Sequence, residues 1–185
     1  VAQVVNAVNR NAVARSLMEK AIGVHPERKL PPYSPGTFRR RAAASRSHEV
    51  RNGERTPGKV AVFSTCYVNY NEPGIGHDLL AVLDHNGIPH VIVEKEACCG
   101  MPKLELGDLE GVERLKAVNV PRLVGLAREG YAILAAVPSC TLMFKSELPL
   151  LFPDDAEVKA VSEAMFDPFE YFVLRKRDGL LKTDF

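Results

Sequence analysis

The residues best suited to do chemistry in this chain are its four cysteines, which all lie in the central part of the sequence. They are Cys66, the adjacent pair Cys98 and Cys99, and Cys140. Thiolates are ligands for zinc and for iron-sulfur clusters. If the fold brings the four side chains together, they form a sulfur-only ligand set for an inorganic centre.

The segments that precede the cysteines predict how the thiols are positioned. Each cysteine or cysteine pair follows a short apolar run, and these runs cover residues 60–63, 90–93 and 132–137. Short β-branched runs bounded by Gly and Pro predict buried strands, and the amphipathic segments between them predict crossover helices. The expected fold is α/β, with a small parallel sheet flanked by helices. Because parallel strands end at one edge of a sheet, where ligands bind, we expect the thiols to converge there.

The chain divides into two regions by composition. Residues 1–58 predict an N-terminal helix over positions 1–22 and then an irregular connector rich in Pro and Arg. The arginines that make the connector basic include Arg39, Arg40, Arg41, Arg46, Arg51 and Arg55. This basic arm is either solvated surface or a docking arm for an acidic partner, and Tyr33 and Phe38 are its expected anchors if it packs. Residues 59–185 form the predicted cysteine-rich domain.

Three local patterns in this domain lead to further expectations. Gly74-Ile75-Gly76 lacks the third glycine of a dinucleotide-binding loop, so no such site is predicted. A helical pattern over residues 107–130 contains Pro121, which predicts a kink or two shorter helices. Asp167-Pro168 predicts the start of a last helix that buries Phe169, Phe172 and Val173.

The overall composition excludes some classes of function. The chain is 46% hydrophobic and 25% charged with a net charge of +1, which gives no electrostatic basis for binding nucleic acid. No apolar run approaches the roughly 20 residues that a membrane-spanning helix needs. The cysteines are expected to remain thiols in a reducing, cytoplasmic compartment, because vicinal cysteines pair poorly with each other.

Three interpretations of the cysteines stay open at this point. A structural zinc site usually takes cysteines in pairs separated by two or more residues, and the adjacent Cys98 and Cys99 depart from that spacing. An iron-sulfur cluster has several irons, so neighbouring thiolates can bind different atoms, and the pair favours a cluster over zinc. Buried thiols without a ligand are the third interpretation. Gly100 and Pro102 are expected to shape the loop, and Lys145 to offset negative charge.

These residues resemble a known family, the cysteine-rich CCG domain. That domain is found in subunits of heterodisulfide reductase, in lactate-utilisation iron-sulfur proteins and in a subunit of anaerobic glycerol-3-phosphate dehydrogenase. The resemblance covers residues 59–185 and is strongest to the glycerol-3-phosphate dehydrogenase branch. It is carried by Cys66-Tyr67-Val68-Asn69-Tyr70-Asn71-Glu72-Pro73, Cys98-Cys99-Gly100-Met101-Pro102 and Pro138-Ser139-Cys140-Thr141-Leu142-Met143.

The resemblance implies an iron-sulfur electron-transfer module or subunit of an oxidoreductase rather than a stand-alone enzyme. Cys66, Cys98, Cys99 and Cys140 would be the ligands of a 4Fe-4S cluster, and electrons would pass from a flavin-containing partner to a quinone or disulfide acceptor. The family also implies a ferredoxin-like domain and a second CCG module as partners, and attachment to the inner membrane through them. In the heterodisulfide reductase relatives five thiolates hold a noncubane cluster, whereas this chain has Met143 at the position of the fifth. The alternative is a zinc-binding or metal-free scaffold that docks other subunits.

Overall fold

The computed structural model describes residues 1–45 and 49–184; Arg46 and Phe185 lie outside the described residues. Within that part of the chain, four parallel strands form one sheet in the order β2-β1-β3-β4, which confirms the expected α/β class. The strands are β1 (Val60–Phe63), β2 (His90–Ile92), β3 (Ala132–Ala135) and β4 (Met165–Phe166). The first three occupy the predicted apolar runs, and β4 was not predicted, since its two residues are too few for a strand pattern.

Strand β1 lies at the centre of the sheet, between β2 and β3. Val60 is in register with His90 on one side and with Ala132 on the other. All residues of β1 and β3 are buried, as expected for parallel strands covered on both faces. The chain passes from β2 across β1 to β3, so the strand order reverses beside β1, and ligands bind at this kind of position in open α/β sheets.

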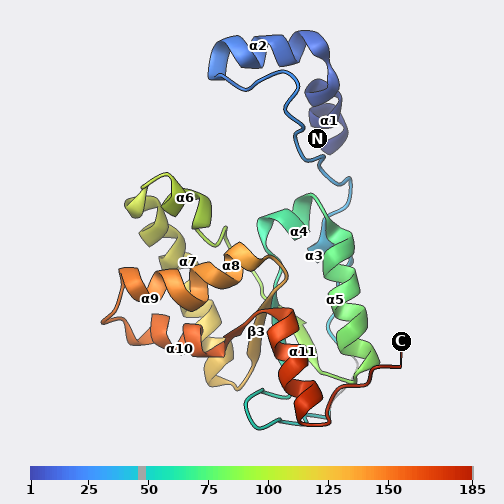
Figure 1. Cartoon of the computed structure of the whole chain (residues 1–185), viewed down its shortest axis with the longest axis vertical. Coiled ribbons are helices and arrows are strands. Elements are labelled where there is room, and N and C mark those ends of the chain that lie inside the picture. The colour runs from blue at the N-terminus through green and yellow to red at the C-terminus, as the bar shows by residue number, and fades with distance from the viewer. Residues whose placement is uncertain (46–48, 185) are drawn as a thin grey trace.

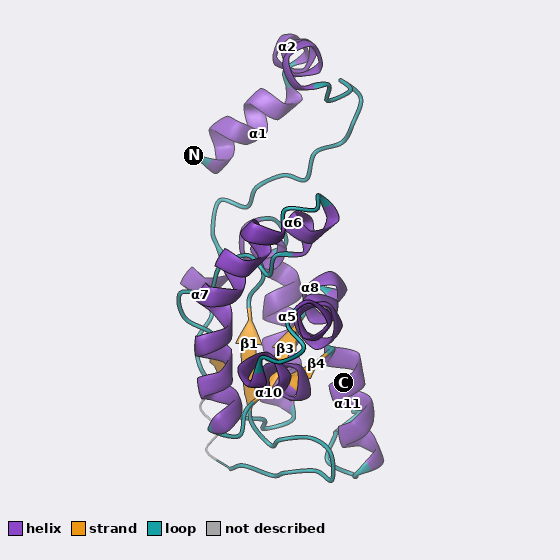
Figure 2. Ribbon diagram, turned by 90° about the vertical axis from the view of Figure 1, so that its left-hand side faces the viewer, coloured by secondary structure: helices purple, strands orange, loops and turns teal. Residues whose placement is uncertain are grey.

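Helices cover both faces of the sheet. On one face, β1 and β3 side chains pack with α7 (Leu109–Arg128) and α10 (Ala156–Ala164), and on the other with α5 (Pro73–His85) and α11 (Pro168–Arg177). Figure 1 shows α7 and α10 on the opposite side of β3 from α5, and Figure 2 shows the strands enclosed by helices. Despite Pro121, α7 is one continuous helix.

The remaining helices of the domain are short. Three of them are the next helices in the chain after strands β1, β2 and β3, and the others complete the connection to α10. They are α4 (Cys66–Tyr70), α6 (Met101–Glu105), α8 (Pro138–Leu142), the π-helical turn η1 (Met143–Glu147) and α9 (Leu148–Leu151). Helix α4 begins at Cys66, because the Thr65 side chain accepts a hydrogen bond from the Val68 N–H at 3.2 Å and caps a helical turn.

The N-terminal helix expected over residues 1–22 is divided in two. Helices α1 (Ala2–Arg10) and α2 (Ala12–Ile22) meet at Asn11, which has an extended backbone and accepts a hydrogen bond from the Ala14 N–H at 3.0 Å. An Asn side chain that caps the next helix competes with helical continuation, which explains the break. Figure 1 shows both helices standing away from the sheet.

The connector packs against the domain. Its short helix α3 (Phe38–Arg41) places the Phe38 ring at 0% exposure among residues of α4 and α5, whereas Tyr33 is 44% exposed. Further along, the Pro57 carbonyl accepts a hydrogen bond from the Tyr171 hydroxyl at 2.7 Å. Of the two expected anchors, Phe38 is therefore the one in the core.

Helix α11 starts as predicted but turns a different face inward. Asp167 accepts a hydrogen bond from the Phe169 N–H at 2.8 Å and caps the helix. Phe169 is 80% and Val173 50% exposed, and Tyr171 and Leu174 are buried instead. The expected burial of Phe169 and Val173 was wrong, because apolar residues occur on more than one side of this helix and their pattern alone does not define the inner face.

Candidate metal centre

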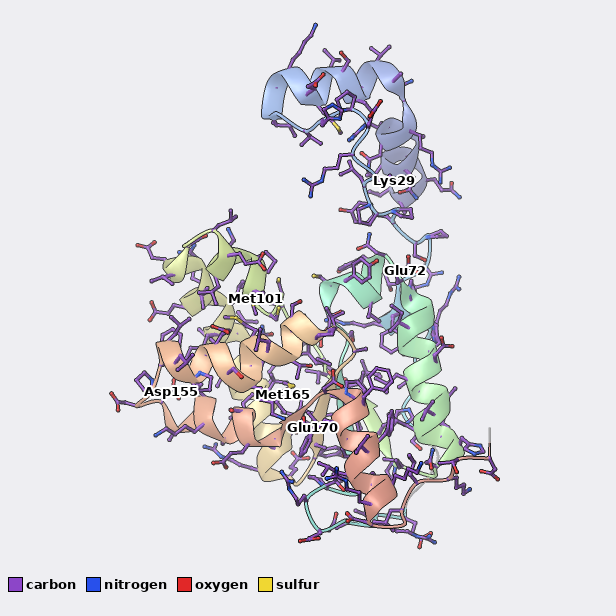
Figure 3. All side chains as sticks on the ribbon, viewed as in Figure 1. Lys29, Glu72, Met101, Asp155, Met165 and Glu170 are labelled. Carbon is purple, nitrogen blue, oxygen red and sulfur yellow. The ribbon has the colours of Figure 1, made fainter. Side chains whose placement is uncertain are left out.

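The structure places all four cysteines at the edge of the sheet where β1, β2 and β3 end. Cys66 is the first residue of α4, Cys98 and Cys99 lie in the loop between β2 and α6, and Cys140 is in α8. Helices α4, α6 and α8 gather at one end of the sheet in Figure 1, and Met101, at the start of α6, lies at the same end in Figure 3. Residues that are far apart in sequence thus meet because parallel strands deliver them to one edge.

The thiols of Cys66, Cys98 and Cys99 are close enough to neighbouring thiols for their pKa values to be shifted. The pKa of Cys98 is lowered to about 2 by hydrogen bonds from the Cys66 and Cys99 thiols. Hydrogen bonding to Cys98, together with burial, raises the pKa of Cys66, and hydrogen bonding to Cys140 and then to Cys98 raises the pKa of Cys99. The thiols therefore form a contiguous row in the order Cys66, Cys98, Cys99, Cys140.

This row runs from solvent into the core. Cys66 is exposed and Cys98 half-buried, whereas Cys99 and Cys140 are each 4% exposed; all four are free thiols. Among the described residues, no three or more His, Cys, Asp or Glu side chains surround one point closely enough to hold a single metal ion. A centre that engages all four sulfur donors therefore has to be larger than a single ion.

Backbone strain is concentrated in the two loops that carry Cys66 and Cys98. In the part of the chain that the structure describes, the non-glycine residues with positive φ are Thr65, at 58°, and Lys95, at 50°. A β-branched residue in this region is a true outlier, and such strain tends to occur at functional sites. Thr65 directly precedes Cys66, and Lys95 lies three residues before Cys98.

Gly100 and Met143 form the wall beside the buried thiols. Gly100 has φ of 103°, a conformation that favours glycine, and a Cβ at this position would lie 3.4 Å from the Met143 methyl group. Met143 is fully buried and begins the π-helical turn that follows Cys140. π-Helical turns are rare in proteins, and those that occur are often found at functional sites. This turn is therefore a second local irregularity beside the thiols. The thioether of Met143 is a weak donor compared with a thiolate.

Asn119, which the sequence analysis did not single out, holds the loop of the cysteine pair. It is 1% exposed on α7, its Oδ1 accepts a hydrogen bond from the Ala97 N–H at 2.9 Å, and its Nδ2 donates to the Cys98 carbonyl at 2.9 Å. A buried amide that satisfies two backbone groups fixes the loop that carries them. The available signal was a polar residue among the apolar positions of the buried face of α7, such as Val112 and Leu123.

We expect Asn119→Asp to loosen this loop. The carboxylate keeps an acceptor for the Ala97 N–H but has no donor for the Cys98 carbonyl. One carboxylate oxygen would then lie against the carbonyl oxygen of Cys98, so the free energy of unfolding should fall by about 1–3 kcal/mol. Urea unfolding of both proteins measures the loss. The control is Asn86→Asp, whose amide donates to the Val82 carbonyl at a half-buried helix end, where water can replace the bond. Equal losses in the two variants would contradict a special role for Asn119.

Lys145 and His77 make contacts with acidic and aromatic residues of the domain. Lys145, expected to offset negative charge at the site, is ion-paired with Glu170 of α11, and its ammonium lies 5.4 Å from the centre of the Phe166 ring. The His77 ring packs edge-on against Phe38, with centroids 5.3 Å apart. None of the helices in residues 1–45 and 49–184 has the length and apolar character to cross a membrane.

Comparison with known proteins gives consistent relatives. Residues 60–145 match the CCG cysteine-rich domain. The chain is 33% identical over 153 residues to a subunit of anaerobic glycerol-3-phosphate dehydrogenase of Escherichia coli K12, covering 80% of this chain and 37% of the relative. It is 29% identical over 116 residues to a subunit of the fumarate reductase (CoM/CoB) of Methanothermobacter marburgensis, covering 62% and 22%. An iron-sulfur protein of Methanocaldococcus jannaschii is 34% identical over 62 residues, covering 34% and 13%.

No solved structure matches the chain. The chain spans little more than a third of the length of the glycerol-3-phosphate dehydrogenase relative that it matches. The matched domain contains all four cysteines together with strands β1, β2 and β3. The region that carries the four thiols is therefore a CCG cysteine-rich domain.

Proposed function

We propose that this chain is an iron-sulfur electron-transfer module of a multi-subunit oxidoreductase. The observation that carries the proposal is the contiguous row of four free thiols at one sheet edge, in which hydrogen bonds between neighbouring thiols shift the pKa of Cys66, Cys98 and Cys99. The relatives named as dehydrogenase and reductase subunits, and the one named as an iron-sulfur protein, support the same conclusion.

The donor set suits an iron-sulfur cluster. Cys66, Cys98, Cys99 and Cys140 would hold it, and a cluster of several irons can take adjacent thiolates on different atoms, whereas a single zinc ion needs all its donors around one point. Such a cluster, when bound, supplies one-electron oxidation and reduction. We propose a 4Fe-4S cluster with these four thiolates, since the thioether of Met143 does not replace a fifth.

The chain's own residues would position and shield this centre. Asn119 and Gly100 would fix the loop of the cysteine pair, and Met143 and the core around Cys99 and Cys140 would exclude water from the buried side. Cys66 and Cys98 would lie on the accessible side. Because electrons pass between centres that approach closely, the accessible side is the proposed point of exchange with a partner.

The partners belong to the same proposal. Electrons would come from a flavin-containing protein and leave towards a quinone or disulfide acceptor, with a ferredoxin-like domain and a second CCG module as intermediates. The assembly would be cytoplasmic and held at the inner membrane surface by these partners. Residues 1–58 would be the connector and residues 59–185 the cluster-binding domain.

Anaerobic purification tests the proposal. We expect a coloured protein with iron and acid-labile sulfide in similar amounts, and little zinc. Visible absorption, metal analysis and a sulfide assay on one preparation measure this. A colourless protein that carries one zinc per chain and no sulfide would refute the electron-transfer role and support the scaffold.

A further inference from the structure

The side chain of Arg39, in α3 of the N-terminal arm, contacts the loops of the accessible cysteines. Its Nη2 lies 2.5 Å from Glu96 Oε1 and donates to the Glu96 carbonyl at 3.4 Å, and its Nε donates to Ser64 Oγ at 3.3 Å. Ser64 lies two residues before Cys66, and Glu96 two residues before Cys98. One guanidinium thus contacts both loops.

The second carboxylate oxygen of Glu96 links the two loops directly. Glu96 Oε2 accepts a hydrogen bond from the Ser64 N–H at 2.9 Å, so the carboxylate joins the end of β1 to the segment after β2. The Glu96 side chain is 2% exposed, and the Arg39 side chain 31%. The backbone N–H of Arg39 also donates to Asn69 Oδ1 in α4 at 3.1 Å. We call Arg39, Glu96 and Ser64 the arginine latch.

The arginine latch differs from an ordinary surface ion pair. Exposed ion pairs contribute little to stability, because water screens the attraction and ordering two long side chains costs entropy. Here the carboxylate is buried, so loss of the arginine leaves a buried charge without its partner, which is strongly unfavourable. A planar guanidinium can also bond to Glu96 and Ser64 at the same time, which a lysine ammonium does not reproduce. The contact therefore holds the two loops at one separation.

The two loops belong to the two more accessible thiols. Cys99 and Cys140 lie in the hydrophobic core and are held by its packing, whereas Cys66 is exposed and Cys98 half-buried. Core packing does not fix the distance between Cys66 and Cys98. That distance depends on the loops that carry the two residues. Arg39 lies outside residues 60–145, which match the family domain, so this contribution comes from the arm.

We propose that Arg39 and Glu96 are positioning residues that hold Cys66 against Cys98, so that the N-terminal arm completes the accessible half of the ligand row. The proposal rests on the proposed cluster for its function, but the approach of the two thiols can be measured without iron. The arm is then a part of the site and not only a tether.

The first experiment uses the full chain freed of metal and reduced. Dibromobimane, a fluorogenic reagent that bridges neighbouring thiols, forms two thioether bonds and releases two bromide ions and two protons for each pair. Peptide mapping identifies the bridged cysteines. In Arg39→Met we expect the Cys66–Cys98 bridge to form about tenfold more slowly, because a reaction that joins two groups depends on how closely they are held together. The Cys99–Cys140 bridge should form at the wild-type rate.

Two further variants keep the test sharp. Arg39→Lys retains the positive charge but not the planar guanidinium, so its rate of Cys66–Cys98 bridging should fall between those of wild type and Arg39→Met. It also provides a folded variant if Arg39→Met unfolds. Tyr171→Phe is the matched control, because it removes another bond between arm and domain, the hydroxyl to the Pro57 carbonyl, at a distance from the cysteines. It should leave the Cys66–Cys98 rate unchanged.

The second experiment uses iron-loaded protein. Loss of iron to a chelator should be about 10- to 100-fold faster in Arg39→Met than in Tyr171→Phe, with a shifted midpoint potential. A wild-type chain without iron would refute the proposed function and leave the bridging result to decide the arginine latch. Wild-type bridging rates in folded Arg39→Met and Arg39→Lys would overturn the arginine latch whatever the iron content.

Discussion

Replacing Cys99 with serine should abolish retention of the cluster. Cys99 is 4% exposed and interacts with both Cys98 and Cys140, so it lies in the interior of the thiol row. A serine hydroxyl is a far weaker ligand for iron than a thiolate. Changes to residues that only support the ligands already weaken metal binding by about 10- to 100-fold, and the loss of a direct ligand should cost more. Iron and sulfide per chain and visible absorption after anaerobic desalting measure the effect.

The matched control for Cys99→Ser is Met101→Leu. Met101 is a buried sulfur-containing residue two positions along the same segment, 8% exposed, and its replacement disturbs packing without removing a thiol. This variant should keep wild-type iron and sulfide. If Cys99→Ser retains them as well, Cys99 is no ligand, and the row of thiols does not act as one donor set.

Replacing Phe38 with alanine should strongly destabilise the domain, although Phe38 belongs to the arm. Its ring is fully buried among residues of α4 and α5 and meets His77 edge-on. Large-to-small changes of buried aromatic residues cost about 3–5 kcal/mol, because apolar contact is lost and a cavity remains. Urea unfolding of the full chain should therefore show a midpoint well below that of wild type.

Tyr33→Ala is the control for Phe38→Ala, since Tyr33 is 44% exposed and its contact with Asn6 uses backbone atoms. It should change the free energy of unfolding by less than about 1 kcal/mol, as surface substitutions usually do. A small effect of Phe38→Ala, similar to that of Tyr33→Ala, would show that the arm packs loosely. Arg39, the next residue, would then not be held firmly enough to fix its ion pair with Glu96.

Gly76 shows why the packing site of Phe38 was not predicted. In the sequence, Gly74-Ile75-Gly76 has meaning only as an incomplete dinucleotide loop that lacks its third glycine. In the structure a Cβ on Gly76 would lie 2.6 Å from the Phe38 ring, so the glycine leaves room for the arm. This need arises from a segment that lies far earlier in the chain, and no local pattern reports it.

The patterns that were predicted correctly are local. The strands before Cys66 and Cys98 are apolar runs bounded by turns, and the cap at Asp167 uses neighbouring residues only. The predictions that failed depend on competition between helix capping and helix continuation, or on what a segment packs against. Asn11 divides a regular helical pattern, and the inner face of α11 is chosen by its contact with the sheet and not by its own composition.

The meeting of the four thiols at one sheet edge could be inferred from the amino-acid sequence, because strand-length apolar runs precede them and parallel strands end together. Their order along the row, and the groups that hold it, became known from the folded chain. The Asn119 amide, the Glu96 carboxylate and the Arg39 guanidinium come from α7, the segment after β2 and the N-terminal arm. A buried polar group is satisfied by whichever partner the fold brings within hydrogen-bonding distance, and that partner has no fixed spacing in sequence.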